Sequence, residues 1–175
     1  SETDRAEWES YVDSRPSCWH YHRIGWKEVI ETAYGHQCRY LVARDNGLVS
    51  GILPMAVIRS RLFGHSMTSL PFLDYSGLVA DSSAVRDALI AHAIRMTDET
   101  RTDYLELRQT EPVADQFRTD TQKVTLVLDL PADPEQLLNA LPPERRNRIR
   151  KARKSELTVE FHDRSMLATF YRIWT

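Results

Sequence analysis

The densest chemistry in this sequence is a run of positive charge between residues 145 and 154. It holds seven cations and no acid, namely Arg145, Arg146, Arg148, Arg150, Lys151, Arg153 and Lys154. At 100° per residue, Ile149 and Ala152 share one narrow helical face, and the cations occupy nearly all the rest. A solvated helix usually carries acids for i to i+4 pairing, and none follows Glu144 within this run. Because an arginine guanidinium can donate two parallel hydrogen bonds to phosphate oxygens, the run predicts an anionic partner such as phosphate, pyrophosphate or an RNA backbone.

The charge that balances this run could also come from the same chain. The chain holds 23 Lys and Arg against 25 Asp and Glu, and 16 of the cations remain when this run is set aside. Acids elsewhere in the fold can therefore neutralise the helix without any ligand. This second interpretation stays open beside the first. The overall charge pattern is not that of a globally basic nucleic-acid-binding protein.

A second group of polar side chains lies where sites are commonly built, in an ordered loop and at a strand end. Asp74 and Tyr75 fall in a loop punctuated by Pro and Gly, and Arg108 ends an alternating strand predicted over 103–108. These three residues are candidate substrate-binding groups. An ion pair from Arg108 to Asp74 or to Glu106 that only holds the loop explains the same residues equally well.

Glycine and serine spacing argues against several chemistries. Only six Gly occur, and no two lie closer than Gly47 and Gly51, so neither a dinucleotide fingerprint nor a Walker loop can be built. The same count excludes the usual acetyl-coenzyme A loop, whose amides face a pyrophosphate at a helix N-terminus. No Gly-x-Ser-x-Gly elbow occurs, so hydrolase chemistry is unsupported.

Histidine and cysteine spacing predicts no metal or redox site. His20 and His22 could place two imidazoles on one side of a strand, but no third ligand follows at a suggestive spacing, so ordinary histidines are favoured. Cys18 and Cys38 are the only cysteines and form no Cys-x-x-Cys pair. A reducing cytoplasm fits this usage best.

Apolar periodicity and turn signals predict a mixed α/β layer fold. Asp45-Asn46-Gly47 is a strong hairpin turn, and Asp133-Pro134 starts a helix with a cap and a first-turn proline. Helices are expected over 4–14, 26–32 and 83–100, from 133, over 144–154 and from 165, and strands over 39–44, 48–58, 103–108, 123–130 and 157–161, with one or two short strands within 60–80.

Length and composition predict one soluble domain of 175 residues with 42% hydrophobic residues. No run reaches the roughly 18 apolar residues of a membrane span. The chain starts at Ser1, and it finishes within an apolar-periodic run that has no stop signal. We therefore expect the domain, residues 1–175, to be truncated in its last helix and to be part of a longer protein.

A set of short motifs runs in order along the whole chain. The motifs are Ile24-Gly25-Trp26-Lys27-Glu28-Val29-Ile30, the hairpin 40–54 that ends Gly51-Ile52-Leu53-Pro54, Leu62-Phe63-Gly64, Ser69-Leu70-Pro71-Phe72, Asp74-Tyr75-Ser76-Gly77, Tyr104-Leu105-Glu106-Leu107-Arg108 and the segment 141–152 that contains Pro142-Pro143-Glu144-Arg145-Arg146. Together they resemble the FemAB family, whose members transfer aminoacyl groups to peptidoglycan precursors and contain two GNAT-like domains. In detail the set is similar to a subgroup associated with exosortase (PEP-CTERM) and exopolysaccharide gene clusters.

The resemblance implies the fold of the N-terminal GNAT-like domain of such a protein, a mixed sheet flanked by helices. It implies a cytoplasmic acyl- or aminoacyltransferase, with aminoacyl-tRNA or acyl-coenzyme A as donor and an anionic, nucleotide-linked envelope precursor as acceptor. Carried over, Trp26, Lys27, Arg150 and Lys154 bind the acceptor. The family's peptidoglycan members have a Lys two residues after the Trp, where this chain has Glu28, and an acid there would repel a pyrophosphate.

Two functional hypotheses follow. The first is this transferase domain, inactive by itself because the second GNAT-like domain that completes the cleft is missing. It binds substrate through the basic and aromatic positions Trp26, Lys27, Asp74, Tyr75, Arg108, Arg145, Arg146, Arg148, Arg150 and Lys154, binds no cofactor of its own, and has no assigned general base. The second is a non-catalytic module that docks RNA, tRNA included, or an acidic protein through 145–154.

Overall fold

The computed structural model describes residues 2–62, 64–120, 124–155 and 157–175. The chain divides into two compact units, residues 1–125 and 126–175, which are described separately below. In the described part of the chain, no helix combines the length and the apolar character that a membrane crossing requires.

The first unit is a mixed α/β structure, as the sequence predicts. In chain order its elements are α1 (Glu2–Ser14), the 3₁₀ turn η1 (His20–His22), α2 (Gly25–Tyr34), β1 (Gln37–Cys38), β2 (Leu41–Asp45), β3 (Leu48–Leu53), β4 (Ala56–Ser60), β5 (Gly64–Thr68), β6 (Val79–Ala80), α3 (Ser83–Thr100) and β7 (Tyr104–Glu106). The three predicted helices are confirmed, and α3 spans the predicted residues 83–100. The two short strands expected within 60–80 are β5 and β6.

Two small sheets make up the β-layer. One has the strand order β1-β4-β5-β7 and the other β2-β3-β6. All pairs are antiparallel except β5 and β7, which run parallel with Met67 opposite Leu105. A parallel pair needs a crossover connection, and here α3 lies between β6 and β7 in the chain.

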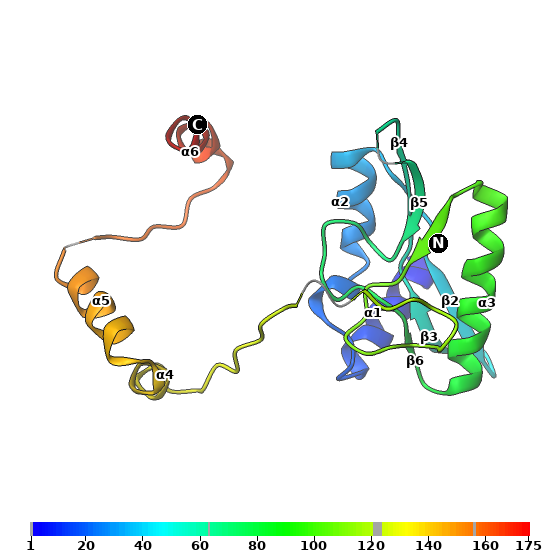
Figure 1. Ribbon diagram of the computed structural model, residues 1–175, viewed down its shortest axis with the longest axis horizontal. Helices are drawn as coiled ribbons and strands as arrows, with labels where there is room; N and C mark the ends of the chain where they lie inside the picture. The colour runs from blue at the N-terminus through cyan, green and yellow to red at the C-terminus, as the bar shows by residue number, and fades with distance from the viewer. Residues whose placement is uncertain (1, 63, 121–123, 156) are drawn as a thin grey trace. The chain divides into compact units, whose positions relative to one another are not determined.

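Helices cover both faces of this layer, because successive residues of a strand point to opposite sides. In β3, Ile52 packs with Trp8 of α1, whereas Leu53 belongs to the cluster that contains Ala93 of α3. Figure 1 shows α2 and α3 on opposite sides of the strands. Gly51 lets α3 come close, since an added Cβ would lie 2.6 Å from Val85 Cγ1.

The hairpin β2–β3 forms as predicted. Asn46 and Gly47 occupy the turn with positive φ angles of 48° and 84°, the conformation that a type I′ turn requires. The prediction of one continuous strand over 48–58 is wrong, because β3 ends at Leu53 and β4 starts at Ala56 in the other sheet. Pro54 has no N–H to donate to a ladder, so the chain leaves the first sheet at this residue.

An ion-paired network fastens α1 to the turn before α3. The Tyr11 hydroxyl donates to Asp81 Oδ1 at 2.9 Å, and the Arg15 guanidinium donates to both Asp81 oxygens at 2.8 and 2.7 Å. Arg15 also lies over the Tyr11 ring, 4.9 Å from its centroid. The pKa of Asp81 is lowered mainly by its hydrogen bond from Arg15. These contacts fix the chain just before the N-terminal turn of α3.

The second unit contains α4 (Pro134–Ala140), α5 (Pro143–Arg153), the turn η2 (Arg164–Met166) and α6 (Leu167–Trp174). The predicted helices are confirmed, and the Asp133 side chain caps α4 by accepting from Glu135 N–H at 3.0 Å. The strands predicted over 123–130 and 157–161 are wrong within the described residues, since 124–130 and 157–161 form neither helix nor strand. Lys123 lies outside the described residues.

Candidate functional site

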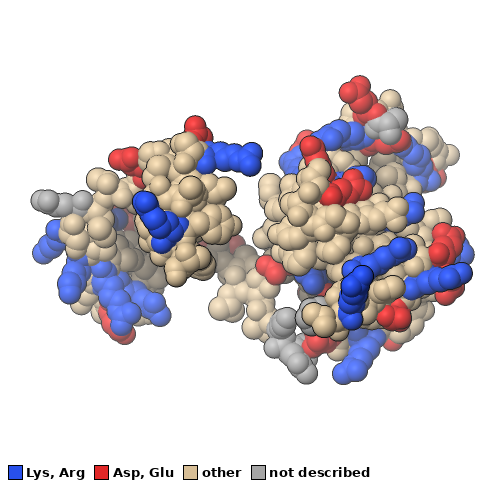
Figure 2. Space-filling model, turned by 90° about the horizontal axis from the view of Figure 1, so that it is seen from above, with Lys and Arg blue, Asp and Glu red and all other residues tan. Residues whose placement is uncertain are grey.

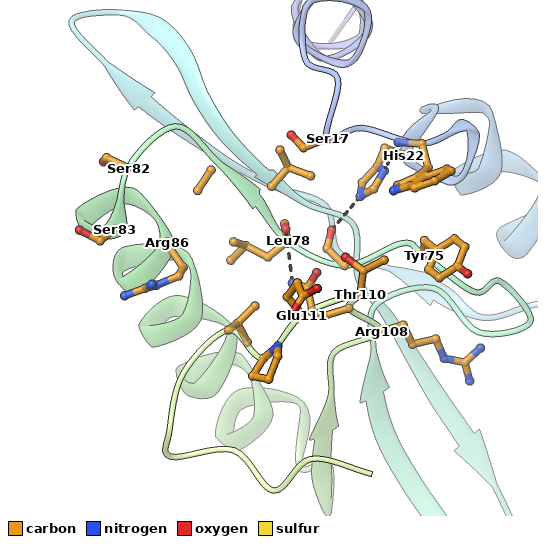
Figure 3. A pocket seen from close by; sticks show the side chains of 17 residues that line it. Ser17, His22, Tyr75, Leu78, Ser82, Ser83, Arg86, Arg108, Thr110 and Glu111 are labelled. Carbon is orange, nitrogen blue, oxygen red and sulfur yellow. Dashed lines mark hydrogen bonds between the residues drawn. The ribbon is translucent and has the colours of Figure 1, made fainter. Parts of the chain in front are cut away.

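The first unit contains a pocket of about 440 Å³ between the edge of β6, the start of α3 and the segment that follows β7 (Figure 3). Backbone and polar side chains dominate the wall. The lining residues are Ser17, Trp19, His22, Tyr75, Gly77, Leu78, Val79, Ala80, Ser82, Ser83, Arg86, Arg108, Gln109, Thr110, Glu111, Pro112 and Val113.

Gly77 forms the tightest point of this wall. A Cβ added to Gly77 would lie 2.4 Å from Gln109 Cδ and 2.6 Å from the Arg108 carbonyl oxygen. The Gln109 amide donates to the Leu78 carbonyl at 3.3 Å, so the two segments are tied together where they meet. This position needs a glycine because no side chain fits between the two backbones.

His22 closes the pocket from the side of η1. Its Nδ1 accepts from Trp19 N–H at 2.9 Å, and its Nε2 lies 3.0 Å from the Gly77 carbonyl oxygen. Since Nδ1 accepts, Nε2 carries the proton and donates to Gly77. The side chain is 2% exposed, and this burial lowers its pKa. With both nitrogens committed, His22 holds the pocket wall and is not placed to act as a general base.

We expect the free energy of unfolding to fall as the pH drops below 6.5, the ordinary pKa of histidine. The folded state keeps His22 neutral while the unfolded chain takes up a proton, so stability decreases by at most about 1.4 kcal/mol per pH unit for this group. Urea titrations at successive pH values measure the slope. The variant His22→Gln should be less stable but should lose this component of the slope. An unchanged slope in the variant would assign the effect to another group.

Aromatic rings gather beside the pocket. The Trp19 and Tyr75 rings lie 5.1 Å apart, and Tyr21 contacts both Tyr75, at 6.4 Å, and Trp26, at 6.3 Å. The chain of contacts from Trp26 to Trp19 therefore runs through Tyr21 and Tyr75. Trp19 is 42% exposed, and this leaves ring surface available for stacking on a flat group.

Arg108 connects the pocket to the loop 69–76. It donates from Nε to Glu106 at 2.8 Å and from Nη1 to the Leu73 carbonyl at 2.8 Å. Of the two ion pairs considered for this residue, the one with Glu106 forms. Asp74 is exposed on the loop. Arg108 is thus a lining residue of the pocket whose guanidinium points away from it and supports the loop (Figure 3).

The predicted residues of the first unit are partly brought together. Tyr75 and Arg108 line the pocket, and Trp26 reaches it through Tyr21. Lys27 does not join them, because its ammonium pairs with Glu31 of the same helix at 2.5 Å. Sequence reasoning missed several pocket residues, namely Trp19, His22, Gly77, Arg86, Gln109 and Glu111.

The second unit presents the predicted basic helix, α5. Arg148 pairs with Glu144 at 2.6 Å, Arg153 lies 3.7 Å from Glu135, and Arg146 donates to the Asn139 carbonyl. Within the described residues of this unit, no acidic side chain pairs with the other four cations of the run, Arg145, Arg150, Lys151 and Lys154. Figure 2 shows Lys and Arg side chains crowded together on this unit with few acids among them.

Within the described ranges, no three His, Cys, Asp or Glu side chains are grouped to hold a metal ion. His20 and His22 belong to a 3₁₀ turn instead of a strand. Comparisons with protein-family models, curated proteins and solved structures found no match to this chain.

Proposed function

We propose that this chain is a GNAT-like, FemAB-like domain of an acyl- or aminoacyltransferase, and that it holds an anionic, nucleotide-linked precursor of the bacterial cell envelope. The observation that carries the proposal is the charge on α5. Within the described residues of its own unit, only two cations of the run 145–154, Arg148 and Arg153, pair with an acid. Clustered cations without counter-charges favour binding of a phosphate or pyrophosphate group.

The fold and the pocket support the same proposal. The first unit is a mixed α/β layer flanked by helices, and its pocket offers hydroxyl groups and the Trp19 and Tyr75 rings. Such a wall can hydrogen-bond a polar ligand and stack on a flat one. In this proposal the domain positions the acceptor, and the acyl donor is an aminoacyl-tRNA or acyl-coenzyme A.

Calorimetric titration with UDP-N-acetylmuramoyl pentapeptide tests the proposal. We expect binding that weakens roughly tenfold in the double variant Arg150→Gln/Lys154→Gln, since each exposed charge-assisted contact contributes about 0.5–1 kcal/mol. Glutamine keeps the helix propensity of α5 nearly unchanged, and circular dichroism checks this. The difference in affinity between the two proteins should become smaller as the salt concentration is raised.

A matched variant controls for net charge. Arg61→Gln/Arg95→Gln removes two exposed cations outside α5, and it should leave the affinity unchanged within about twofold. An equal loss in both double variants would contradict a local site on α5. Absence of binding to any nucleotide-linked precursor would contradict the proposal itself, and tighter, steeply salt-dependent binding of a short RNA would favour the RNA-docking module instead.

A further inference from the structure

Three aromatic rings form an exposed platform on the first unit, on residues that the pocket does not use. Tyr34 at the end of α2 stacks on Phe72 with 4.4 Å between ring centroids and 27° between planes. His36 lies 6.2 Å from Phe72 at 23° and 6.4 Å from Tyr34 at 5°. The three rings are thus close to parallel. Tyr34 is 52% exposed and Phe72 is 60% exposed.

The backbone of the loop that exposes Phe72 adopts unfavourable conformations. Leu70 and Phe72 have φ angles of 51° and 70°, a region that costs a non-glycine residue of order 1–3 kcal/mol. Leu70 and Leu73 are both buried in the core beneath the loop, and Pro71 is buried too, so Phe72 alone is turned outward in this segment. In the free protein, the stacking of Phe72 on Tyr34 offsets only part of this cost, since an aromatic pair contributes about 0.5–1.5 kcal/mol. Strain that persists around an exposed ring is typical of a binding surface.

Hydrogen bonds make both sides of the platform rigid. In the loop, the Ser76 hydroxyl donates to the Ser69 carbonyl, and the Arg108 amide donates to Ser69 Oγ at 2.7 Å. On the helix side, Gly35 ends α2 with a φ of 69° and donates to the Ile30 carbonyl. The rings are therefore positioned before any ligand arrives, which lowers the entropy lost on binding.

We infer that this platform binds a neutral sugar ring of a glycan chain. Tyr34 and Phe72 cover one face of each other, and the 60% exposure of Phe72 leaves ring surface on its outer side free for a ligand. The face of an aromatic ring is negative, and it suits the weakly positive C–H face of a pyranose. The Tyr34 hydroxyl and the His36 ring nitrogens lie at ring edges, where they can meet sugar hydroxyls. The two segments that build the platform, 34–37 and 70–73, contain no Lys, Arg, Asp or Glu, so a neutral ligand fits them.

Two other occupants fit less well. Single-stranded nucleic acid stacks on aromatic residues but also requires cations along its backbone, and these segments supply none. A second protein copy usually covers about 800 Å² on each partner. Two half-exposed rings of about 200 Å² each, with a half-buried histidine, offer far less area than that.

Titration with cellohexaose, followed by calorimetry and by NMR of the aromatic side chains, tests the inference. We expect a Kd of about 1 mM, weakened roughly tenfold in Tyr34→Ala and in Phe72→Gly. Phe72→Gly is informative because glycine accepts a positive φ, so binding should fall while thermal stability stays the same or rises. Leu62→Ala, which removes an even more exposed apolar side chain elsewhere, should not change the affinity.

The outcomes separate the alternatives. Tighter binding of a short oligothymidine than of cellohexaose would overturn the inference in favour of nucleic acid. A concentration-dependent dimer that Phe72→Gly dissolves would overturn it in favour of a second copy. No binding of cellohexaose or of maltohexaose would also overturn it. None of these results bears on precursor binding by α5, because the variants leave α5 intact.

Discussion

Trp8→Ala is expected to lower the free energy of unfolding by about 4 kcal/mol, the cost of truncating a large buried aromatic residue. Trp8 is 2% exposed, and its ring packs against the Tyr40 ring at a tilt of 36° with 4.9 Å between centroids. Its Nε1 donates to the His22 carbonyl at 2.6 Å. The alanine variant therefore leaves a cavity in the core and an unpaired carbonyl on the residue that closes the pocket.

Urea unfolding of three variants measures this effect. Trp8→Phe keeps much of the ring volume but loses the donor, so we expect a smaller loss of about 1–2 kcal/mol. Trp19→Ala removes a ring that is 42% exposed, and it should cost under about 1 kcal/mol. Equal losses for Trp8→Ala and Trp19→Ala would show that α1 contributes little to the core.

Gly77→Ala is expected to destabilise the chain by about 3 kcal/mol and to deform the pocket. The new Cβ would meet the Arg108 carbonyl oxygen at 2.6 Å and the Gln109 side chain at 2.4 Å. The side chain can rotate away, but the backbone of Arg108 is held by the hydrogen bond from its own amide to Ser69. Overpacking against a fixed backbone typically costs 1–3 kcal/mol or more.

Thermal unfolding and a second glycine provide the comparison. An added Cβ at Gly25 meets no atom within 4 Å, so Gly25→Ala should change the stability by no more than about 0.5 kcal/mol. The double variant Gly77→Ala/Gln109→Ala relieves only the side-chain contact. Full recovery of stability in this double variant would contradict the backbone clash and would place the whole effect on Gln109.

Local signals predicted the helices and the hairpin because each was encoded by residues near one another. The cap at Asp133 and the apolar stripe of 83–100 are examples. The sequence prediction ran one strand through Pro54, because the apolar pattern continues from β3 into β4. The missing N–H of the proline was the one local sign that the strand is interrupted there. The segments 124–130 and 157–161 alternate like strands, but periodicity does not supply a neighbouring strand to pair with.

The candidate site was predicted only where local sequence signals mark its residues. Tyr75 and Arg108 stand out by type and by position in loops and strand ends. Gly77 stood out only as the last residue of the motif Asp74-Tyr75-Ser76-Gly77, because its role depends on the approach of Arg108 and Gln109, which lie over 30 residues later in the chain. His22 was interpreted as an ordinary histidine, and its two hydrogen bonds to Trp19 and Gly77 carry no signal in the local sequence.

The parallel pair of β5 and β7 also has a consequence for synthesis of the chain. Ser66 lies opposite Tyr104, and α3 is made between them. While the chain leaves the ribosome, the outer edge of β5 stays open until residue 106 has emerged. Open edges invite pairing with other chains. β5 begins Gly64-His65-Ser66, and these residues have low strand propensity, so the edge is a weak template during that interval.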